Sequence, residues 1–251
     1  MFFERRENLF VGRSPGWFDS AGLVHGFSTR KGGVSAPPYD SLNLGLNTGD
    51  DPQAVEENVR RFCGAAGIRR GRIAFTKQVH GDSVRAAGAP GVYPDTDGLV
   101  TDTPGLVLAV QVADCVPVFL YDPVRRAAGI AHAGWKGSSL HIAAKTVRRL
   151  SEAFGSRPGD LQACIGPSIG PCCYEVGAEA ADRFPSGYLK GNKLDLWGYN
   201  LQTLIDEGIA AENVQVSGLC TGCHREWFFS HRAEGGKTGR MMAVIGLSEK
   251  T

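Results

Sequence analysis

The sequence lacks any apolar run of the length needed to cross a bilayer, which is about 18 or more residues. It also lacks an export signal, because the N-terminal stretch MFFERRENLF interrupts its apolar residues with charge. Neither sign of charge is in excess, since 27 Lys and Arg stand against 26 Asp and Glu, for a net charge of +1. The sequence therefore predicts a soluble, cytoplasmic protein with no general attraction to nucleic acid or to a membrane surface.

Internal repeats, low-complexity tracts and changes in composition that would mark a linker are also missing. The 251 residues are 42% hydrophobic and 21% charged, which is the balance of a globular protein rather than of a disordered chain. A chain of this length buries about 70–75% of its unfolded surface and needs no disulfide to fold. We therefore expect residues 1–251 to form one domain.

Apolar spacing and terminal glycines predict helices at residues 52–66, 138–154, 178–184 and 198–207. Short apolar runs predict strands at residues 106–112, 116–121, 127–132, 161–165, 214–217 and 241–246. The first three strands follow one another closely, so we expect them to form a meander. Because strands come in clusters rather than alternating with helices, the pattern favours an α+β fold over a doubly wound parallel sheet.

Three segments place a potential metal ligand beside glycine or at the end of a predicted strand. They are residues 76–81 with His80, residues 113–117 with Cys115, and residues 132–137 with His132. Two neutral imidazoles and one thiolate leave the fourth corner of a tetrahedral zinc ion open, as catalytic zinc requires. The spacings follow no local ligand rule, so a buried cysteine and hydrogen-bonded core histidines are the competing interpretation of the residues alone.

These segments, together with FSTR at residues 27–30 and IGPSIGPCCYEVG at residues 165–177, resemble the YfiH family, also called the laccase-domain family. The matches keep a consistent order from about Val24 to Arg240. The resemblance implies a four-layer α/β/β/α sandwich of mixed sheets, with its core at about residues 24–246. It also implies one catalytic zinc ion bound by His80, Cys115 and His132, with copper as a possible replacement because these ligand types suit both metals.

The same resemblance implies a purine nucleoside phosphorylase that also deaminates adenosine. Its partners would be small molecules: phosphate with adenosine, inosine, guanosine or methylthioadenosine, giving the base and ribose 1-phosphate. No residue indicates a protein partner. The alternatives are a hydrolase that edits a peptidoglycan precursor, a metal-free enzyme with Cys115 as nucleophile, and a non-catalytic binding domain. A copper-dependent polyphenol oxidase is a further alternative, although six histidines without a His-x-His pair cannot build a multicopper laccase.

Phosphorolysis needs an anion site close to the metal. The predicted helix from residue 138 would offer its N-terminus to phosphate, and Lys136 just before it would add a positive charge. The family usually has Arg at this position, which would bind phosphate through two donors. The loop at residues 28–33, with Ser28 and Arg30, is a second candidate anion site, and a plain surface turn is its alternative interpretation.

Three further polar residues accompany the proposed ligands. Gln78 lies two residues before His80, hence on the same face of a strand, and would orient the nucleoside. Asp114 is expected to face away from Cys115, so it would orient a ligand or cap a turn. Asn43 matches the family pattern and is a candidate for either substrate binding or a structural role.

Seven cysteines in a chain without an export signal argue against a disulfide framework. Cys172, Cys173, Cys220 and Cys223 could hold a structural zinc ion, but we expect buried thiols instead. The run from Cys220 to His224 matches the c-type haem attachment pattern. Since that attachment follows export, we do not expect haem here.

Overall fold

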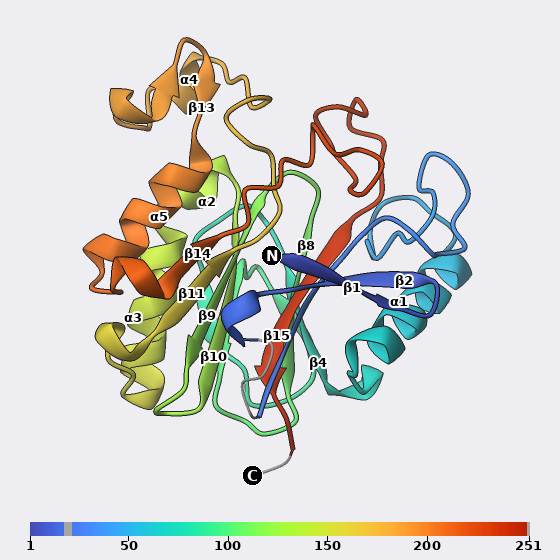
Figure 1. The fold of residues 1–251 in the computed structure, drawn as a ribbon, viewed down its shortest axis with the longest axis horizontal. Coiled ribbons are helices and arrows are strands. Elements are labelled where there is room, and N and C mark those ends of the chain that lie inside the picture. Colours follow the sequence, from blue (N-terminus) through green and yellow to red (C-terminus); the bar gives the residue numbers. More distant parts are fainter. Residues whose placement is uncertain (18–21, 250–251) are drawn as a thin grey trace.

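Two β-sheets lie face to face in the computed structural model, which describes residues 1–17 and 22–249 (Figure 1). The first sheet has the strand order β1-β2-β3-β15-β8-β4-β6, and the second has the order β14-β11-β9-β10-β7-β5. Figure 1 shows α2, α3 and α5 on the outer side of the second sheet and α1 on the outer side of the first. The architecture is a single α+β domain, and its four layers confirm the expected fold class.

The first sheet contains β1 (Phe2–Arg6), β2 (Leu9–Arg13), β3 (Leu23–Ser28), β4 (Ile73–Lys77), β6 (Gly91–Pro94), β8 (Val107–Val112) and β15 (Met241–Leu247). The second contains β5 (Val84–Ala86), β7 (Gly98–Thr101), β9 (Val116–Asp122), β10 (Ala127–Ala133), β11 (Gln162–Ile165) and β14 (Val214–Val216). The helices are α1 (Pro52–Ala66), α2 (Trp135–Ser139), α3 (Ile142–Phe154), α4 (Ala178–Ala181) and α5 (Leu196–Asp206). A two-stranded hairpin is formed by β12 (Leu189–Lys190) and β13 (Lys193–Leu194).

Three apolar cores separate the four layers. One lies between the second sheet and helices α2, α3 and α5, one lies between the two sheets, and one lies between the first sheet and α1. Strands β9, β10 and β15 are buried along their whole length, because each is covered on both faces. Their apolar runs without alternation are the expected sequence of such strands.

The predicted helix at residues 52–66 is confirmed, and both of its ends follow local signals. The side chain of Asp51 accepts a hydrogen bond from the backbone N–H of Gln53, and Pro52 occupies the first helical position. Gly67 ends the helix in the left-handed conformation, with φ of 73°. Apolar residues on one side of this helix pack on the first sheet.

The predicted helix at residues 138–154 is two helices in the structure. The first, α2, begins at Trp135, and α3 begins at Ile142 after a break. His141 sits in the break with φ of 59°, a left-handed conformation that an α-helix does not accommodate. Ser138 therefore lies inside α2 and does not open a helix. The weaker helix expected at residues 178–184 shortens to α4, and α5 begins two residues before the predicted start at residue 198.

The predicted meander of three strands is wrong. Strand β8 pairs with β15 and β4 in the first sheet, whereas β9 pairs with β10 and β11 in the second. The chain changes sheets at Ala113–Cys115, where Asp114 has a φ of 83°. Because both strands are apolar on both faces, the sequence could not indicate which sheet each one joins. The crossing places Cys115 at the end where the two sheets meet.

Within the described parts of the chain, the helices are all too short or too polar to cross a bilayer.

The core between the two sheets should contribute strongly to stability through Phe119, which is 1% exposed. We expect Phe119→Ala to lower the free energy of unfolding by about 3–5 kcal/mol, because the lost ring leaves a cavity that the sheets cannot close. Urea unfolding followed by circular dichroism measures this. The control Val124→Ala, at a side chain that is 65% exposed, should change stability by less than about 0.5 kcal/mol. Equal effects of the two substitutions would contradict the assignment of the core.

Candidate metal centre

His80, Cys115 and His132 come together at one end of the two sheets. His80 lies in the turn after β4, Cys115 directly precedes β9, and His132 is in β10. Antiparallel pairing of β9 with β10 brings Val116 opposite Ala133, so Cys115 and His132 become neighbours. The nitrogen and sulfur atoms that could bind a metal all lie within 4.8 Å of one another. His132 is buried, Cys115 is partly buried and His80 is exposed, so the group opens to solvent on one side.

The buried carboxylate of Asp97 holds the ring of His132 and the backbone of the turn that carries His80. Sequence analysis did not identify it. It accepts hydrogen bonds from the backbone N–H groups of Val79, His80 and Gly81 at 2.9–3.1 Å. The same carboxylate lies 2.8 Å from Nδ1 of His132. The only sequence signal for it would have been an Asp-Gly pair that begins an apolar strand. Such carboxylate–imidazole contacts are typical partners of metal-binding histidines.

The protonation states follow from these contacts. Burial raises the pKa of Asp97, but the hydrogen bonds from His132, Gly81 and Val79 outweigh it and leave the pKa below its ordinary value. The carboxylate is therefore ionised, and Nδ1 of His132 carries the proton toward it. This leaves Nε2 of His132 as the atom available to a metal.

Cys115 is prepared as a thiolate. Burial raises the pKa of its thiol, but His132 and His80 outweigh burial and hold the pKa at about 6. In the same way burial lowers the pKa of His132, yet Cys115 and Asp97 raise it to about 9. The thiolate is the form of cysteine that binds metals, so the group suits a cation that can replace the proton between these residues.

Gly134 leaves room for the three side chains. A Cβ atom at this position would lie 3.0 Å from Sγ of Cys115 and 3.4 Å from Cδ2 of His80. At Gly137, a Cβ atom would lie 2.9 Å from the carbonyl oxygen of Gly81. Two imidazoles, one thiolate and an open side fit a zinc ion with three protein ligands.

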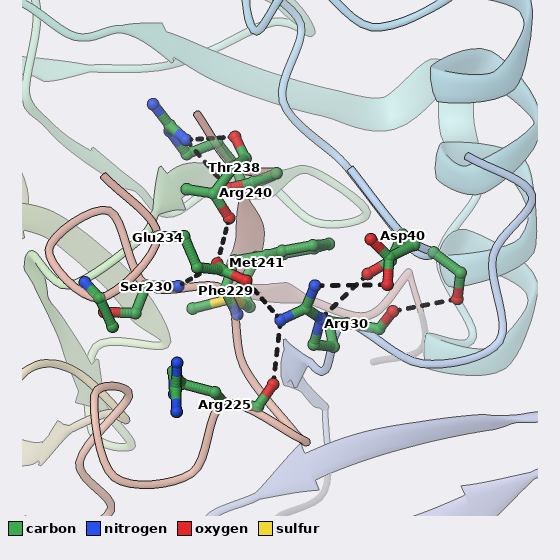
Figure 2. A network of polar contacts seen from close by, with 12 residues as sticks. Arg30, Asp40, Arg225, Phe229, Ser230, Glu234, Thr238, Arg240 and Met241 are labelled. Carbon is green, nitrogen blue, oxygen red and sulfur yellow. Dashed lines mark hydrogen bonds and ion pairs between the residues drawn. The ribbon is translucent and has the colours of Figure 1, made fainter. Parts of the chain in front are cut away.

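Arg30 belongs to a different network, shown in Figure 2, and Ser28 bonds strand β15. The Arg30 guanidinium contacts Glu234 at 2.8 Å, donates to the carbonyl oxygens of Asp40 and Arg225, and stacks on Phe229. It lines an open cavity of about 470 Å³ whose lining contains none of the three proposed ligands. The hydroxyl of Ser28 accepts a hydrogen bond from a backbone N–H of β15. These contacts join the loop at residues 30–41 to the loop at residues 225–240.

Gln78 and Asn43 also use their amides within the fold. The Gln78 side chain accepts from the N–H of Gln111 and donates to its carbonyl oxygen, both at 2.8 Å, which continues the β4–β8 pairing beyond β4. Asn43 is fully buried and bonds Thr48 and the N–H of Arg240. The structure thus gives Gln78 and Asn43 structural contacts.

The carboxylate of Asp114 accepts hydrogen bonds from one hydroxyl and one backbone N–H. Its carboxylate accepts from the hydroxyl of Thr221 at 2.6 Å and from the N–H of Arg232 at 2.7 Å. It thereby anchors the loop at residues 219–232 beside Cys115. Unlike Asp114, Lys136 has an exposed side chain. It lies in the first turn of α2, with its ammonium 5.3 Å from the ring centre of Trp135.

The fold and this centre together define a class of protein: a four-layer α+β domain with two His and one Cys gathered at one end of its sheets. The chain belongs to the family described as "Multi-copper polyphenol oxidoreductase laccase", whose model matches residues 24–248. The family expected from the sequence is thereby confirmed. Among the described residues, two groups of three or more side chains could hold a metal, the trio above and a group of four cysteines. Neither has the many imidazoles of a multicopper centre.

Relatives of the chain carry names that indicate an activity. It is 43% identical over 236 residues to the purine nucleoside phosphorylase of Deinococcus radiodurans, covering 91% of this chain and 90% of that protein. It is 37% identical over 244 residues to the purine nucleoside phosphorylase YfiH of Escherichia coli, covering 93% and 97%. The crystal structure of YlmD from Geobacillus stearothermophilus superposes with a TM-score of 0.91 at 34% identity, covering 98% of this chain and 99% of that one.

Asp97→Asn tests how Asp97 positions the His132 ring and the turn that carries His80. The amide cannot accept from Nδ1 of His132 and from three N–H groups as an ionised carboxylate does, so we expect zinc affinity to fall by about 10–100-fold. Competition with a chromogenic chelator measures the affinity. Asp95→Asn, at an exposed residue in the same turn, should leave the affinity unchanged. Unchanged affinity in Asp97→Asn would refute the positioning role.

Proposed function

We propose that this protein is a zinc-dependent purine nucleoside phosphorylase with adenosine deaminase as a second activity. The observation that carries the proposal is the open group of His80, Cys115 and His132, positioned by Asp97 in a chain whose relatives bear the phosphorylase name. The substrates would be phosphate and adenosine, inosine, guanosine or methylthioadenosine. Copper is the alternative metal, because the same ligand types suit it.

His80, Cys115 and His132 would hold the zinc ion, which when bound supplies Lewis acidity toward an oxygen atom. Asp97 keeps the proton of His132 on Nδ1, so Nε2 stays directed to the centre. In phosphorolysis a phosphate oxygen bonds to C1′ of the ribose while the bond from C1′ to the purine nitrogen breaks. The purine leaves with the bonding electron pair and takes up a proton. In deamination, water adds to the purine ring and ammonia leaves.

Lys136 is the better placed of the two cations predicted to hold phosphate. It is exposed and lies two residues after Gly134, where an added Cβ atom would lie 3.0 Å from Sγ of Cys115. Arg30 is already paired with Glu234, so it would have to exchange that partner for phosphate. The structure offers Arg240 as a further cation. Burial lowers the pKa of its guanidinium, whereas the negative charges of Cys115 and Asp114 raise it.

The proposal is tested by product analysis of zinc-loaded protein incubated with adenosine, with and without phosphate. We expect adenine and ribose 1-phosphate only in the presence of phosphate, and inosine in both reactions. His132→Ala should lose bound zinc and turnover together. The control His141→Asn removes an imidazole outside the centre, and Asn tolerates the left-handed conformation there, so activity should persist. Unchanged adenosine in both reactions would refute the nucleoside assignment and favour a cell-wall precursor as substrate.

Lys136→Ala should raise the KM for phosphate by about 10–100-fold, which corresponds to one charge-assisted hydrogen bond. Zinc content should not change. Lys136→Arg should keep the KM for phosphate at the wild-type value or lower it, because a guanidinium can bind phosphate through two donors. Steady-state kinetics with phosphate as the varied substrate measure this. An unchanged KM in Lys136→Ala would exclude Lys136 from the phosphate site.

A further inference from the structure

Four cysteines gather in a second cluster, contrary to the expectation that they are buried thiols. Cys172 and Cys173 lie in the loop after β11, and Cys220 and Cys223 lie in the loop after β14. Their sulfur atoms all lie within 4.8 Å of one another. Cys220 is buried, Cys173 is partly buried, and Cys172 and Cys223 are exposed. Packing therefore does not explain these thiols, since two of them remain at the surface while turning toward the same point.

The sulfur separations suit a shared metal better than a disulfide. Sγ of Cys223 lies 3.5 Å from that of Cys172 and 3.4 Å from that of Cys173. Zinc binds four thiolates tetrahedrally at about 2.3 Å, which puts the sulfur atoms about 3.8 Å apart. A disulfide requires about 2.05 Å and joins only two sulfur atoms. Because Cys223 faces two partners at nearly equal distances, the geometry selects no single disulfide, whereas a tetrahedral ion would use all four thiolates.

Backbone and sequence features around the cluster also suit a metal site. The N–H of Gly170 donates to Sγ of Cys220 at 3.2 Å. Two residues separate Cys220 from Cys223, which is the usual spacing of a ligand pair in structural zinc sites. Lys193 brings its ammonium to the carbonyl oxygen of Cys172 at 2.8 Å, so a cation lies beside the cluster.

Gly222 allows the two loops to meet. A Cβ atom at this position would lie 3.1 Å from Cβ of Cys173 and 3.3 Å from its Sγ. Both distances are tighter than ordinary contacts, so a larger residue would push Cys173 away from Cys220 and Cys223. The close approach that glycine permits is the approach that a four-thiolate site needs.

We propose that Cys172, Cys173, Cys220 and Cys223 bind one zinc ion as a structural site, separate from the centre at His80, Cys115 and His132. The ion closes its coordination with four protein ligands, and so it leaves no position for a substrate. Its role is to join the loop after β11 to the loop after β14.

Those two loops hold Asp114, the neighbour of Cys115. The N–H of Ile169, from the first loop, donates to the carbonyl oxygen of Asp114 at 2.9 Å. Thr221, which directly follows Cys220, donates to the Asp114 carboxylate. The structural zinc would therefore fix the backbone on which Cys115 is presented, although it does not touch the substrate.

Zinc stoichiometry tests the proposal. Reduced wild-type protein is loaded with zinc, freed of unbound metal and measured by inductively coupled plasma mass spectrometry. We expect two zinc ions per chain in the wild type, one in Cys223→Ser, one in His132→Ala and none in the double variant. Cys63→Ala, at a buried cysteine outside both groups, should keep two. If Cys223→Ser does not fold, Cys172→Ser at the other exposed ligand gives the same expected value.

Two further readouts do not depend on activity. In cobalt-substituted protein, most of the thiolate-to-metal charge-transfer absorbance should vanish in Cys223→Ser and persist in His132→Ala. In zinc-loaded protein, iodoacetamide should modify Cys172 and Cys223 only after a chelator removes the metal, despite their exposure.

One zinc ion per wild-type chain, lost entirely in His132→Ala, would overturn the proposal. A disulfide at Cys223 with no second zinc bound after its reduction would overturn it as well, and iron in place of zinc would overturn the choice of metal. None of these results depends on nucleoside turnover, so the two proposals fail independently.

Discussion

The candidate metal centre depends on one buried carboxylate. Asp97 has no exposed surface, and its two oxygens accept from three consecutive N–H groups and from the ring of His132. A carboxylate without partners in such a place would cost several kcal/mol. The four donors are therefore required by the fold, and they join the turn that carries His80 to the strand that carries His132. The His132 ring cannot turn without losing its contact with Asp97, and the backbone that carries His80 is held by the same carboxylate.

The third ligand is placed by a change of sheet. Because β8 and β9 belong to different sheets, the three residues between them cross from one to the other, and Cys115 is the last of the three. Asp114 makes this crossing in the left-handed conformation, and its carboxylate holds the loop at residues 219–232. The same loop carries Cys220 and Cys223. The two cysteine-containing sites are thus joined through the backbone and hydrogen bonds of Asp114, in a region where both sheets and two long loops meet.

Several polar residues of the family pattern serve this framework. Ser28, Asn43 and Gln78 each complete a backbone hydrogen bond that a strand or loop would otherwise lack. A buried backbone group without a partner is costly, so residues that supply one are as necessary to the fold as ligands are to the site. A sequence pattern does not separate these two roles. The contacts in the structure do separate them. Lys136, by contrast, is exposed and lies two residues after Gly134.

The sequence by itself determined the limits of α1, since Asp51, Pro52 and Gly67 act within a few residues of the helix ends. It also determined the α+β class and, through the family motifs, which His and Cys residues to examine. Only the tertiary structure decided that β8 and β9 join different sheets, that Asp97 holds both the His132 ring and the turn of His80, and that four thiols lie together. The physical reason is the separation along the chain. A helix cap is a contact between residues close in sequence, whereas these features join distant segments, and the residues of one segment do not indicate which other segment it will contact.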